Sequence, residues 1–475
     1  MTIPIGDRAV VLGAGIMGLL AAQVLHDRYR EVVVVDRDDL PGTLEPRRAV
    51  PQARHAHALL PGGHQVLEQL FPGLTRCLAD DGAPVGDLLR DTRIYLGGHR
   101  LRQATSGLVV VSASRGFLEG HLRARVRALP RVRLRARTDV AGLHGCRDGR
   151  RVTAVRLLPR ADHSAEELVD ADLVVDATGR TSRAPAWLDR LGIEGPTEER
   201  VPIDIAYASR RYRLNPLALD GDLAVLHGLT PTHPRGGVLA RIEGGQAILT
   251  LAGVLGDRPS TDPDVFDAFA RSLQFSDIHD AISRAEPVDD PVPHRFPANT
   301  WRHYERLRRL PDGLAVMGDG LCSLNPIYGQ GMTVAAREAI ALGRHLDRHR
   351  NLHAQRFQRE LARLVRSPWQ MATGADLAFP GVEGTPTRSQ RALARYIGRL
   401  HATAAHDVGV AAAFVRVSGL VDDPRTLMRP GIAARVLLGA PPRTARRVPA
   451  GPAQGHPTSS SRVGSPHERG PRGGA

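Results

Sequence analysis

The sequence contains no lysine, and all 64 basic residues in its 475-residue length are arginine. A P-loop nucleotide-binding site and a Schiff-base enzyme both need the lysine ammonium group, so the sequence excludes both classes. Such one-sided usage is typical of a GC-rich genome. It does not by itself indicate a phosphate-binding surface.

The net charge of +14 raises the question of a nucleic-acid partner. The arginines are spread along the chain, and aromatic residues make up only 4% of it. Nucleic-acid-binding surfaces combine a dense basic patch with an appropriate motif, and often with aromatic residues. We therefore expect no nucleic acid among the partners.

Long apolar runs and paired cysteines are also missing. No run approaches the roughly 18 residues of a transmembrane helix, and the N-terminus leads almost directly into an apolar strand rather than a signal peptide. The three cysteines, Cys77, Cys146 and Cys322, are odd in number and scattered, so we predict neither a disulfide framework nor a metal site. These features favour a protein of the reducing cytoplasm without an integral membrane segment.

The most informative stretch covers residues 8–37. An apolar run of strand length leads into Gly13, Gly15 and Gly18, then into helical spacing, and then into a second β-branched run that ends at Asp36. The first glycine permits a tight turn, the second lets the backbone approach a pyrophosphate, and the third lets the helix pack on the sheet. An acidic residue about 20 positions on binds a ribose hydroxyl. The pattern predicts a dinucleotide site.

Two arginines follow in positions suited to an anionic ligand. Arg54 lies in a loop soon after the second strand and could reach the pyrophosphate through two hydrogen bonds. Arg115 lies in the first turn of a predicted helix, where a cation is poorly placed against the helix dipole. An anionic partner and a solvated surface position both remain open for Arg115. We expect His55 and His57 to be loop or pocket-wall residues, because no third metal ligand stands nearby.

Two later turns follow predicted strands. Residues 171–176 form a strand that ends at Asp176 and leads into a turn at Thr178. Residues 314–317 form another strand, which ends in Gly318 and Asp319. Asp319 can bind ribitol or ribose hydroxyls.

A glycine-rich turn from Pro326 to Gly331 then opens a helix with good apolar spacing. The N-terminus of this helix offers free N–H groups and a partial positive charge. Both features suit the electron-rich edge of a flavin.

The pattern along the chain also predicts its organisation. Residues 62–78 are expected to form one helix, and the segment after 201 is strand-rich with few helices. The last residues are rich in Pro, Gly, Ser and Arg and have little to bury. We expect an FAD-binding domain at 1–200 and 298–350, a substrate-binding β-sheet domain at 201–297, a helical region at 351–440 and a disordered tail at 441–475.

Several segments together carry a family resemblance. They are the glycine motif with its acid, DATGR at 176–180, GD at 318–319, and the segments PQARHAH at 51–57, RFPANTWRHY at 295–304 and CSLNPIYGQGM at 322–332. The sequence resembles the group A flavin monooxygenases, which have the para-hydroxybenzoate hydroxylase fold. Within that group it resembles the squalene-epoxidase-like branch, and there the bacterial polyether epoxidases.

The resemblance implies an α/β fold. It consists of a Rossmann-like FAD-binding domain of the GR2 type on a parallel sheet, an inserted mostly β substrate domain and a C-terminal helical region. FAD is the implied cofactor, and NADH or NADPH is a transient reductant. The residues carried over as cofactor-binding are Gly13, Gly15, Gly18, Asp36, Arg37, Arg54, Arg115, Asp319, Pro326, Gly329, Gln330, Gly331 and Met332.

The implied activity is that of a monooxygenase. In such proteins NAD(P)H reduces FAD, O₂ adds to the flavin as a C4a-hydroperoxide, and one oxygen atom passes to the substrate. Because the cofactor carries this chemistry, we name no catalytic side chain. The expected substrate is an apolar natural-product intermediate of polyketide or terpenoid type from bacterial secondary metabolism, which is epoxidised or hydroxylated.

Three other functions are compatible with the same motifs, and a fourth is not. An FAD-dependent reductase or dehydrogenase of the same fold and an aromatic hydroxylase remain open, as does a flavin-binding partner protein without activity. A flavin halogenase would have a Trp-x-Trp-x-x-Ile-Pro motif and a lysine. Since Trp187, Trp301 and Trp369 are isolated and lysine is absent, that interpretation fails.

Overall fold

The computed structural model describes residues 3–42, 47, 51–161 and 164–439. The tail predicted at 441–475 lies outside the described residues. Within them, no helix is both long and apolar enough to cross a membrane.

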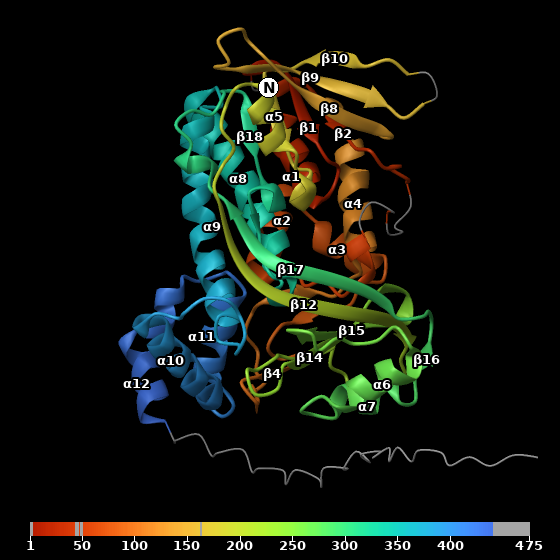
Figure 1. The fold of residues 1–475 in the computed structure, drawn as a ribbon. Helices are drawn as coiled ribbons and strands as arrows, with labels where there is room; N and C mark the ends of the chain where they lie inside the picture. Colours follow the sequence, from red (N-terminus) through yellow and green to blue (C-terminus); the bar gives the residue numbers. More distant parts are fainter. Residues whose placement is uncertain (1–2, 43–46, 48–50, 162–163, 440–475) are drawn as a thin grey trace, which may run out of the picture. The chain divides into compact units, whose positions relative to one another are not determined.

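A five-stranded parallel sheet holds the glycine motif (Figure 1). The inner strands are rich in valine and fully buried, which is typical of a parallel sheet covered on both faces. The register places Leu12 opposite both Val35 and Asp176, so the carboxyl ends of the strands align at one edge. In spatial order the strands are β18 (Leu314–Val316), β11 (Leu173–Asp176), β1 (Gly6–Leu12), β2 (Tyr29–Val35) and β7 (Val132–Arg135).

Four helices and a small sheet pack around these strands. Helix α1 (Ile16–Leu25) packs against α4 (Arg115–Arg127) and α8 (Gly331–His349), and α8 packs in turn against α9 (Ala354–Asp376). The small sheet is antiparallel and consists of β8 (Thr138–Gly145), β9 (Val152–Pro159) and β10 (Glu167–Asp170). The predicted α/β class, with a parallel sheet around the glycine motif, is confirmed.

The helix expected at 62–78 is two helices. Helix α2 (Pro61–Leu70) ends before Pro72, and α3 (Leu74–Asp80) begins after Gly73. Proline lacks a backbone N–H and disfavours helical geometry in the residue before it. Gly73 has a φ of 75°, a left-handed conformation that glycine adopts without strain.

A large mixed sheet lies beside the parallel one. Figure 1 shows its two longest strands, β12 (Glu198–Arg213) and β17 (Val292–Arg302), side by side, and they pair in antiparallel register. The other strands, in spatial order from β12 outward, are β15 (Gln246–Val254), β14 (Arg235–Arg241), β13 (Ala224–His227), β4 (Thr92–Leu96) and β5 (His99–Arg100), with β19 (Cys322–Ser323) beside β17 and β16 (Glu286–Pro287) beside β12.

Strands from three parts of the chain build this sheet. Strands β4 and β5 precede the segment 201–297 by about a hundred residues, and β19 follows it. Strand β4 pairs with β13 in parallel. A parallel partner needs a long crossover connection, so local periodicity gave no indication of this pairing.

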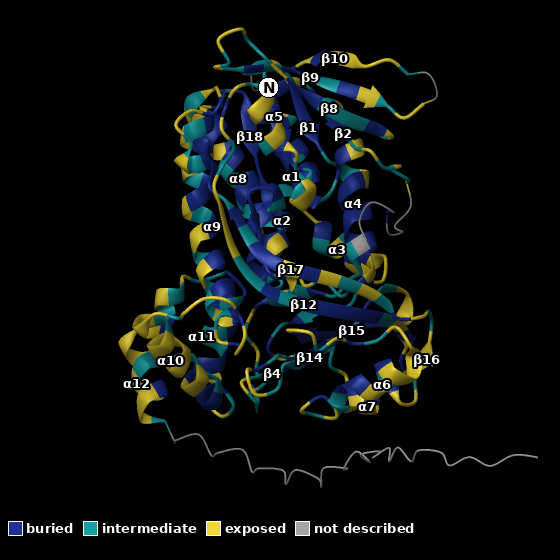
Figure 2. Ribbon diagram, viewed as in Figure 1, coloured by how far each residue is buried: buried dark blue, intermediate teal, exposed yellow. Residues whose placement is uncertain are grey.

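The C-terminal region is helical, as predicted. It contains α9, α10 (Arg388–Ala404), α11 (Val408–Ser418) and α12 (Pro430–Leu438). Figure 2 shows much of α10 and α12 in yellow, and few of their residues are buried. The remaining elements are α5 (Ala184–Arg190), α6 (Pro263–Arg271), α7 (Asp277–Ile282) and the two-stranded sheet of β3 (Val85–Asp87) and β6 (Val109–Val111).

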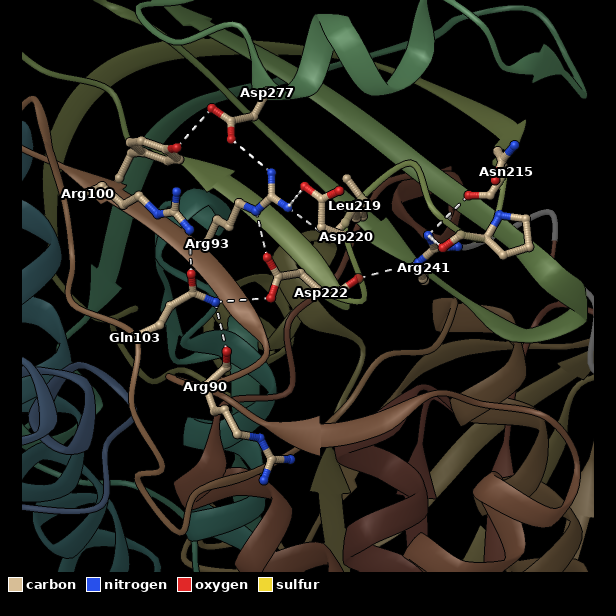
Figure 3. Close-up of polar contacts among 12 residues, drawn as sticks. Arg90, Arg93, Arg100, Gln103, Asn215, Leu219, Asp220, Asp222, Arg241 and Asp277 are labelled. Carbon is tan, nitrogen blue, oxygen red and sulfur yellow. Dashed lines mark hydrogen bonds and ion pairs between the residues drawn. The ribbon is translucent and has the colours of Figure 1, made fainter.

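Arg93 joins the crossover strand β4 to the rest of the large sheet (Figure 3). Its guanidinium donates to Asp222 at 2.6 Å, to Asp220 at 2.8 Å, to Asp277 at 3.1 Å and to the Leu219 carbonyl at 2.9 Å. The Arg93 side chain is only 12% exposed. The arginine therefore compensates several acids that the loop after β12 and helix α7 bring to one place.

We predict that Arg93→Ala lowers the free energy of unfolding by about 2–3 kcal/mol, because the variant leaves partly buried carboxylates without their cation. Urea unfolding at neutral pH measures this loss. The control is Arg211→Ala, which breaks the more exposed pair with Asp289 and should cost less than about 1 kcal/mol. Equal losses in the two variants would contradict the role given to Arg93.

Candidate cofactor site

The three glycines after β1 meet different surroundings. Gly13 has a φ of 97°, and a Cβ placed there would lie 2.7 Å from the Ala177 carbonyl oxygen. At Gly18 an added Cβ would lie 1.8 Å from the Gly13 carbonyl oxygen, so only glycine lets α1 approach the strand this closely. At Gly15 it would meet no atom within 4 Å. This is the position from which a ligand can approach the backbone.

The N-terminus of α1 is suited to an anion. No side chain caps it, and no acidic residue lies in its first turn. Free N–H groups and the partial positive charge of the helix therefore point out of the sheet edge. A pyrophosphate fits these donors and the open space above Gly15.

Asp36 lies directly after β2 and closes the loop from the other side. Its carboxylate accepts hydrogen bonds from the N–H of Ala14 at 2.7 Å and of Asp38 at 2.9 Å. Arg47 Nη1 lies 3.2 Å from the same carboxylate, is buried and has no hydrogen-bond partner among the described residues. A buried guanidinium beside a carboxylate fits a ligand that carries both phosphate and ribose hydroxyls.

The other arginines take different positions. Arg115 begins α4 and lies 3.4 Å from Glu119, which also binds Arg47 at 2.7 Å. Arg115 therefore lies at the candidate site, and Glu119, which it shares with Arg47, compensates part of its charge. Arg37 and Arg54 are exposed and make no hydrogen bond or ion pair with any described residue. Their predicted contacts with the cofactor stay predictions.

The turn after β11 meets the glycine loop. Asp176 is fully buried and accepts hydrogen bonds from Thr178 Oγ1 at 2.6 Å and Ser182 Oγ at 2.5 Å. These bonds fix the turn on which Arg180 lies. The Arg180 guanidinium lies 5.3 Å from the centre of the Phe296 ring, on the large sheet.

Asp319 is an acid without a protein partner. It lies in the turn that follows β18, and no hydrogen bond or ion pair with another described residue reaches its carboxylate. Burial raises the pKa of Asp319 above its ordinary value, and the nearby Arg180 and Arg115 oppose that rise. A carboxylate in this setting can accept hydrogen bonds from ligand hydroxyls.

Glu338 holds the backbone of that turn. The carboxylate, fully buried on α8, accepts the Gly318 N–H at 2.6 Å, and its second oxygen has no hydrogen-bond partner among the described residues. Burial raises the pKa of Glu338 to about 8. Sequence analysis missed this residue, although one charged residue among the alanines of an apolar helix face was a usable signal.

Asp376, at the end of α9, fixes the glycine-rich turn before α8. This fully buried carboxylate accepts hydrogen bonds from Asn299 Nδ2 at 2.6 Å, Tyr328 Oη at 2.7 Å and Asn325 Nδ2 at 2.9 Å. Three donors converge on one buried acid, so the position of the turn is strongly constrained. No local pattern links residues this far apart in the sequence.

The turn leads to the open N-terminus of α8. Gly329 has a φ of 65°, and a Cβ there would lie 3.1 Å from Ala58 Cβ, whereas a Cβ at Gly331 would meet nothing within 4 Å. Oε1 of the buried Gln330 has no hydrogen-bond partner in the part of the chain that the structure describes. Since α8 has no side-chain cap, its N–H groups are available to a ligand, and the surroundings of Pro326 to Met332 fit the edge of a planar ring.

A narrow pocket joins the elements around these turns. It is lined by residues of the loop before α2, of β6, of the start of α4 and of the start of α8: His57, Leu59, Val111, Ala113, Ser114, Arg115, Leu118 and Met332. His57, expected to be a loop or pocket-wall residue, is one of the lining residues. Burial, together with the nearby Arg115, lowers the pKa of His57 to about 3.

The large sheet turns aromatic and imidazole side chains toward the same loop. The rings of Tyr207 and His294 are stacked with centroids 6.0 Å apart, and His55 lies 5.2 Å from His294. His55 Nδ1 is 2.7 Å from Ser209 Oγ, which ties the loop to β12. Burial, with His294 and Arg54, lowers the pKa of His55 to about 4.

Residues 8–357 match the model of the FAD-binding domain family. The chain belongs to this family, so the prediction of an FAD-binding fold is confirmed, and membership supports FAD as the cofactor. The squalene-epoxidase-like branch and the polyether epoxidases are finer assignments that stay predictions.

One protein is similar to this chain in sequence, and two solved structures are similar to it in fold. Protein Rv3254 of Mycobacterium tuberculosis is 36% identical over 394 residues, which are 80% of this chain and 82% of that protein. A flavoprotein/dehydrogenase from Cytophaga hutchinsonii has a TM-score of 0.65 at 13% identity, over 91% of this chain and 99% of that one. The p-nitrophenol 4-monooxygenase PnpA from Pseudomonas putida has a TM-score of 0.62 at 15% identity, over 88% and 99%. At such identities the structures show a shared fold.

We predict that Gly15→Ala weakens FAD binding by at least about ten-fold, or about 1.4 kcal/mol, without changing the melting temperature of the FAD-free protein. An alanine Cβ meets no protein atom there, so any loss reports on the ligand. Titration of the FAD-free protein with FAD, followed by flavin fluorescence, measures the affinity. Gly398→Ala, equally open but on α10, serves as the control. Wild-type affinity in Gly15→Ala would contradict the placement of the pyrophosphate.

We predict that Glu338→Gln reduces the loss of stability with rising pH. The folded protein keeps the Glu338 proton up to about pH 8, whereas the unfolded chain loses it above about pH 4.5. Stability therefore falls across this window, by about 3 kcal/mol at pH 7. Glutamine keeps an acceptor for Gly318 and has no proton to lose.

Urea unfolding of both proteins between pH 5 and pH 8 checks this. The variant should gain stability relative to the wild type as the pH rises, since all other titrating groups are common to both. Parallel curves would show that Glu338 is ionised in the fold.

Proposed function

We propose that the protein is an FAD-dependent monooxygenase that uses NADH or NADPH and O₂ to oxygenate an apolar small molecule. The observation that carries the proposal is the meeting of three turns around an unpaired acid, Asp319, next to a wall of neutral rings. FAD, when bound, supplies the redox chemistry that activates O₂. The protein then has to bind and orient both molecules and exclude water.

The residues would divide these tasks by position. The turn of Gly13, Gly15 and Gly18, with the N-terminus of α1, binds the pyrophosphate. Asp36 and Arg47 hold the adenosine ribose and its phosphate, and Asp319 accepts from hydroxyls of the ribityl chain. The open N-terminus of α8 orients the flavin and stabilises negative charge on it. Predicted contacts from Arg37, Arg54 and Arg115 would require these side chains to turn toward the cofactor.

The protonation of the wall favours a particular substrate class. His55 and His57, with pKa values of about 4 and about 3, are neutral at pH 7 and are weak bases. A phenol is activated by a base, whereas an alkene needs none. We infer an alkene of polyketide or terpenoid type and epoxidation as the preferred reaction. Hydroxylation of an aromatic ring is the second candidate, since the p-nitrophenol 4-monooxygenase PnpA, named for a phenol, shares the fold.

A reductase or dehydrogenase is the alternative that the Cytophaga flavoprotein/dehydrogenase supports. The two classes differ in the fate of O₂. A monooxygenase places one oxygen atom of O₂ in its product, whereas a dehydrogenase places none there.

The test begins with the visible absorption spectrum of the purified protein, followed by NADH or NADPH oxidation in air and a screen of alkenes and phenols under ¹⁸O₂. We predict flavin bands, slow reductant oxidation that a substrate accelerates, and one ¹⁸O atom in the product. Flavin bands with oxidation that needs no O₂ and leaves no label would overturn the monooxygenase in favour of a dehydrogenase. No flavin, even after incubation with FAD, would overturn both.

Asp319→Ala tests the cofactor placement in the same assay. We expect the variant to be purified without flavin, because its ribityl acceptor is gone. Asp264→Ala, which removes an exposed acid on α6, is the control and should retain wild-type flavin content. A flavin-loaded Asp319→Ala would show that the acid is not a cofactor contact.

A further inference from the structure

A cluster of histidines lies at the C-terminal end of α8. The glycine-rich turn lies at the other end of this helix. His345 and His349 are four residues apart on α8, which places both on one face of the helix. Their rings lie with centroids 4.8 Å apart. A tight connection, with Arg350 at a φ of 57°, leads back into α9, which Figure 1 shows beside α8. Glu360 on α9 faces the two histidines.

The ring nitrogens of the buried histidine in this cluster make no hydrogen bond. The His345 side chain is completely buried, yet among the described residues neither of its ring nitrogens has a hydrogen-bond partner, and Nε2 of His349 has none either. Nδ1 of His345 approaches a Glu360 oxygen to 3.3 Å without hydrogen-bonding geometry. A buried polar group without a hydrogen bond costs free energy, so a ligand that satisfies these nitrogens is favoured.

The three residues offer the donor atoms of a metal site. One ligand atom from each of His345, His349 and Glu360 lies within 4.8 Å of the others. Imidazole nitrogens and a carboxylate bind Zn²⁺ at about 2.0–2.2 Å, which needs only small side-chain rotations to close the triangle. The His345 ring packs against the Phe357 ring, with centroids 5.2 Å apart. This apolar contact provides no hydrogen bond for the His345 ring nitrogens.

We propose that His345, His349 and Glu360 bind a divalent first-row transition metal, with Zn²⁺ as the expected ion, and that the metal joins the end of α8 to α9. Two histidines and one carboxylate leave at least one coordination position for water or an anion. Sequence analysis predicted no metal site, because its criterion was adjacent ligands or paired cysteines, and Glu360 comes from another helix.

The charges around the site affect its strength. The groove that contains Glu360 is also lined by Arg348, Arg356, Arg359 and Arg363. The positive charges of these arginines repel a metal cation and weaken its binding. Glu360 is the carboxylate that offsets them. The arginines also provide donors for an anion in the open coordination position.

The test is a calorimetric titration of the full-length protein, free of any histidine tag, with ZnCl₂. We predict one strong site in the wild type. His349→Gln and Glu360→Gln should each weaken binding by at least about ten-fold, since even residues that only support metal ligands cost that much when removed. Zn²⁺ should also raise the melting temperature of the wild type, because a ligand that binds only the folded state stabilises it, and should raise it less in the two variants.

Two control variants keep the proposal falsifiable. His279→Gln removes a histidine on α7 that belongs to no cluster. Cys77→Ser removes one of a second possible ligand group, with Asp81 and His121. Both should bind Zn²⁺ like the wild type, and circular dichroism verifies that every variant is folded. The proposal is overturned if the wild type binds no Zn²⁺, if His349→Gln and Glu360→Gln bind it unchanged, or if Cys77→Ser loses the site instead.

Discussion

The candidate cofactor site depends on how closely helix α1 approaches strand β1. The contact exists because Gly18 has no side chain: a Cβ would lie 1.8 Å from the Gly13 carbonyl oxygen. Strand β1 is the centre of the parallel sheet, with Leu12 opposite both Val35 and Asp176. The register therefore brings the turns after three strands to one edge, and the helix N-terminus arrives among them. Any displacement of α1 would separate the uncapped N–H groups at its N-terminus from the acids of the neighbouring turns.

Buried acids then hold each turn in place. Asp176, Glu338 and Asp376 are all completely buried, and each accepts at least one hydrogen bond from the turn that it supports. Burial of a polar group costs free energy unless hydrogen bonds compensate it. In return, a network of satisfied buried donors fixes one geometry. In this way the chain keeps Asp319 and the N-terminus of α8 in position without placing a protein partner on Asp319 itself.

The sequence was sufficient where the signal was local. The order of strand, Gly13, Gly15, Gly18, helix and Asp36 predicted the parallel sheet and the edge at which the candidate site lies, because each step follows from neighbouring residues. Arg47 and Asp376 could not be found in this way, since their partners lie on other elements. The single helix expected at 62–78 was wrong for a local reason: Pro72 and Gly73 break the helix although apolar residues continue with helical spacing on both sides. The pairing of β4 with β13 had no local signal at all.

The side chains of the large sheet that face the loop of His55 differ in whether they bind this loop. Ser209 and Thr250 hold the loop that contains His55 through hydrogen bonds of 2.7 Å and 2.8 Å, so the sheet is fixed against the cofactor loop. Tyr207 is on the same face of β12 as Ser209, because alternate residues of a strand share a face. Its buried hydroxyl has no hydrogen-bond partner among the described residues. The loop is therefore held to β12 and β15 by side-chain hydrogen bonds, whereas the Tyr207 hydroxyl holds none of the described residues in place.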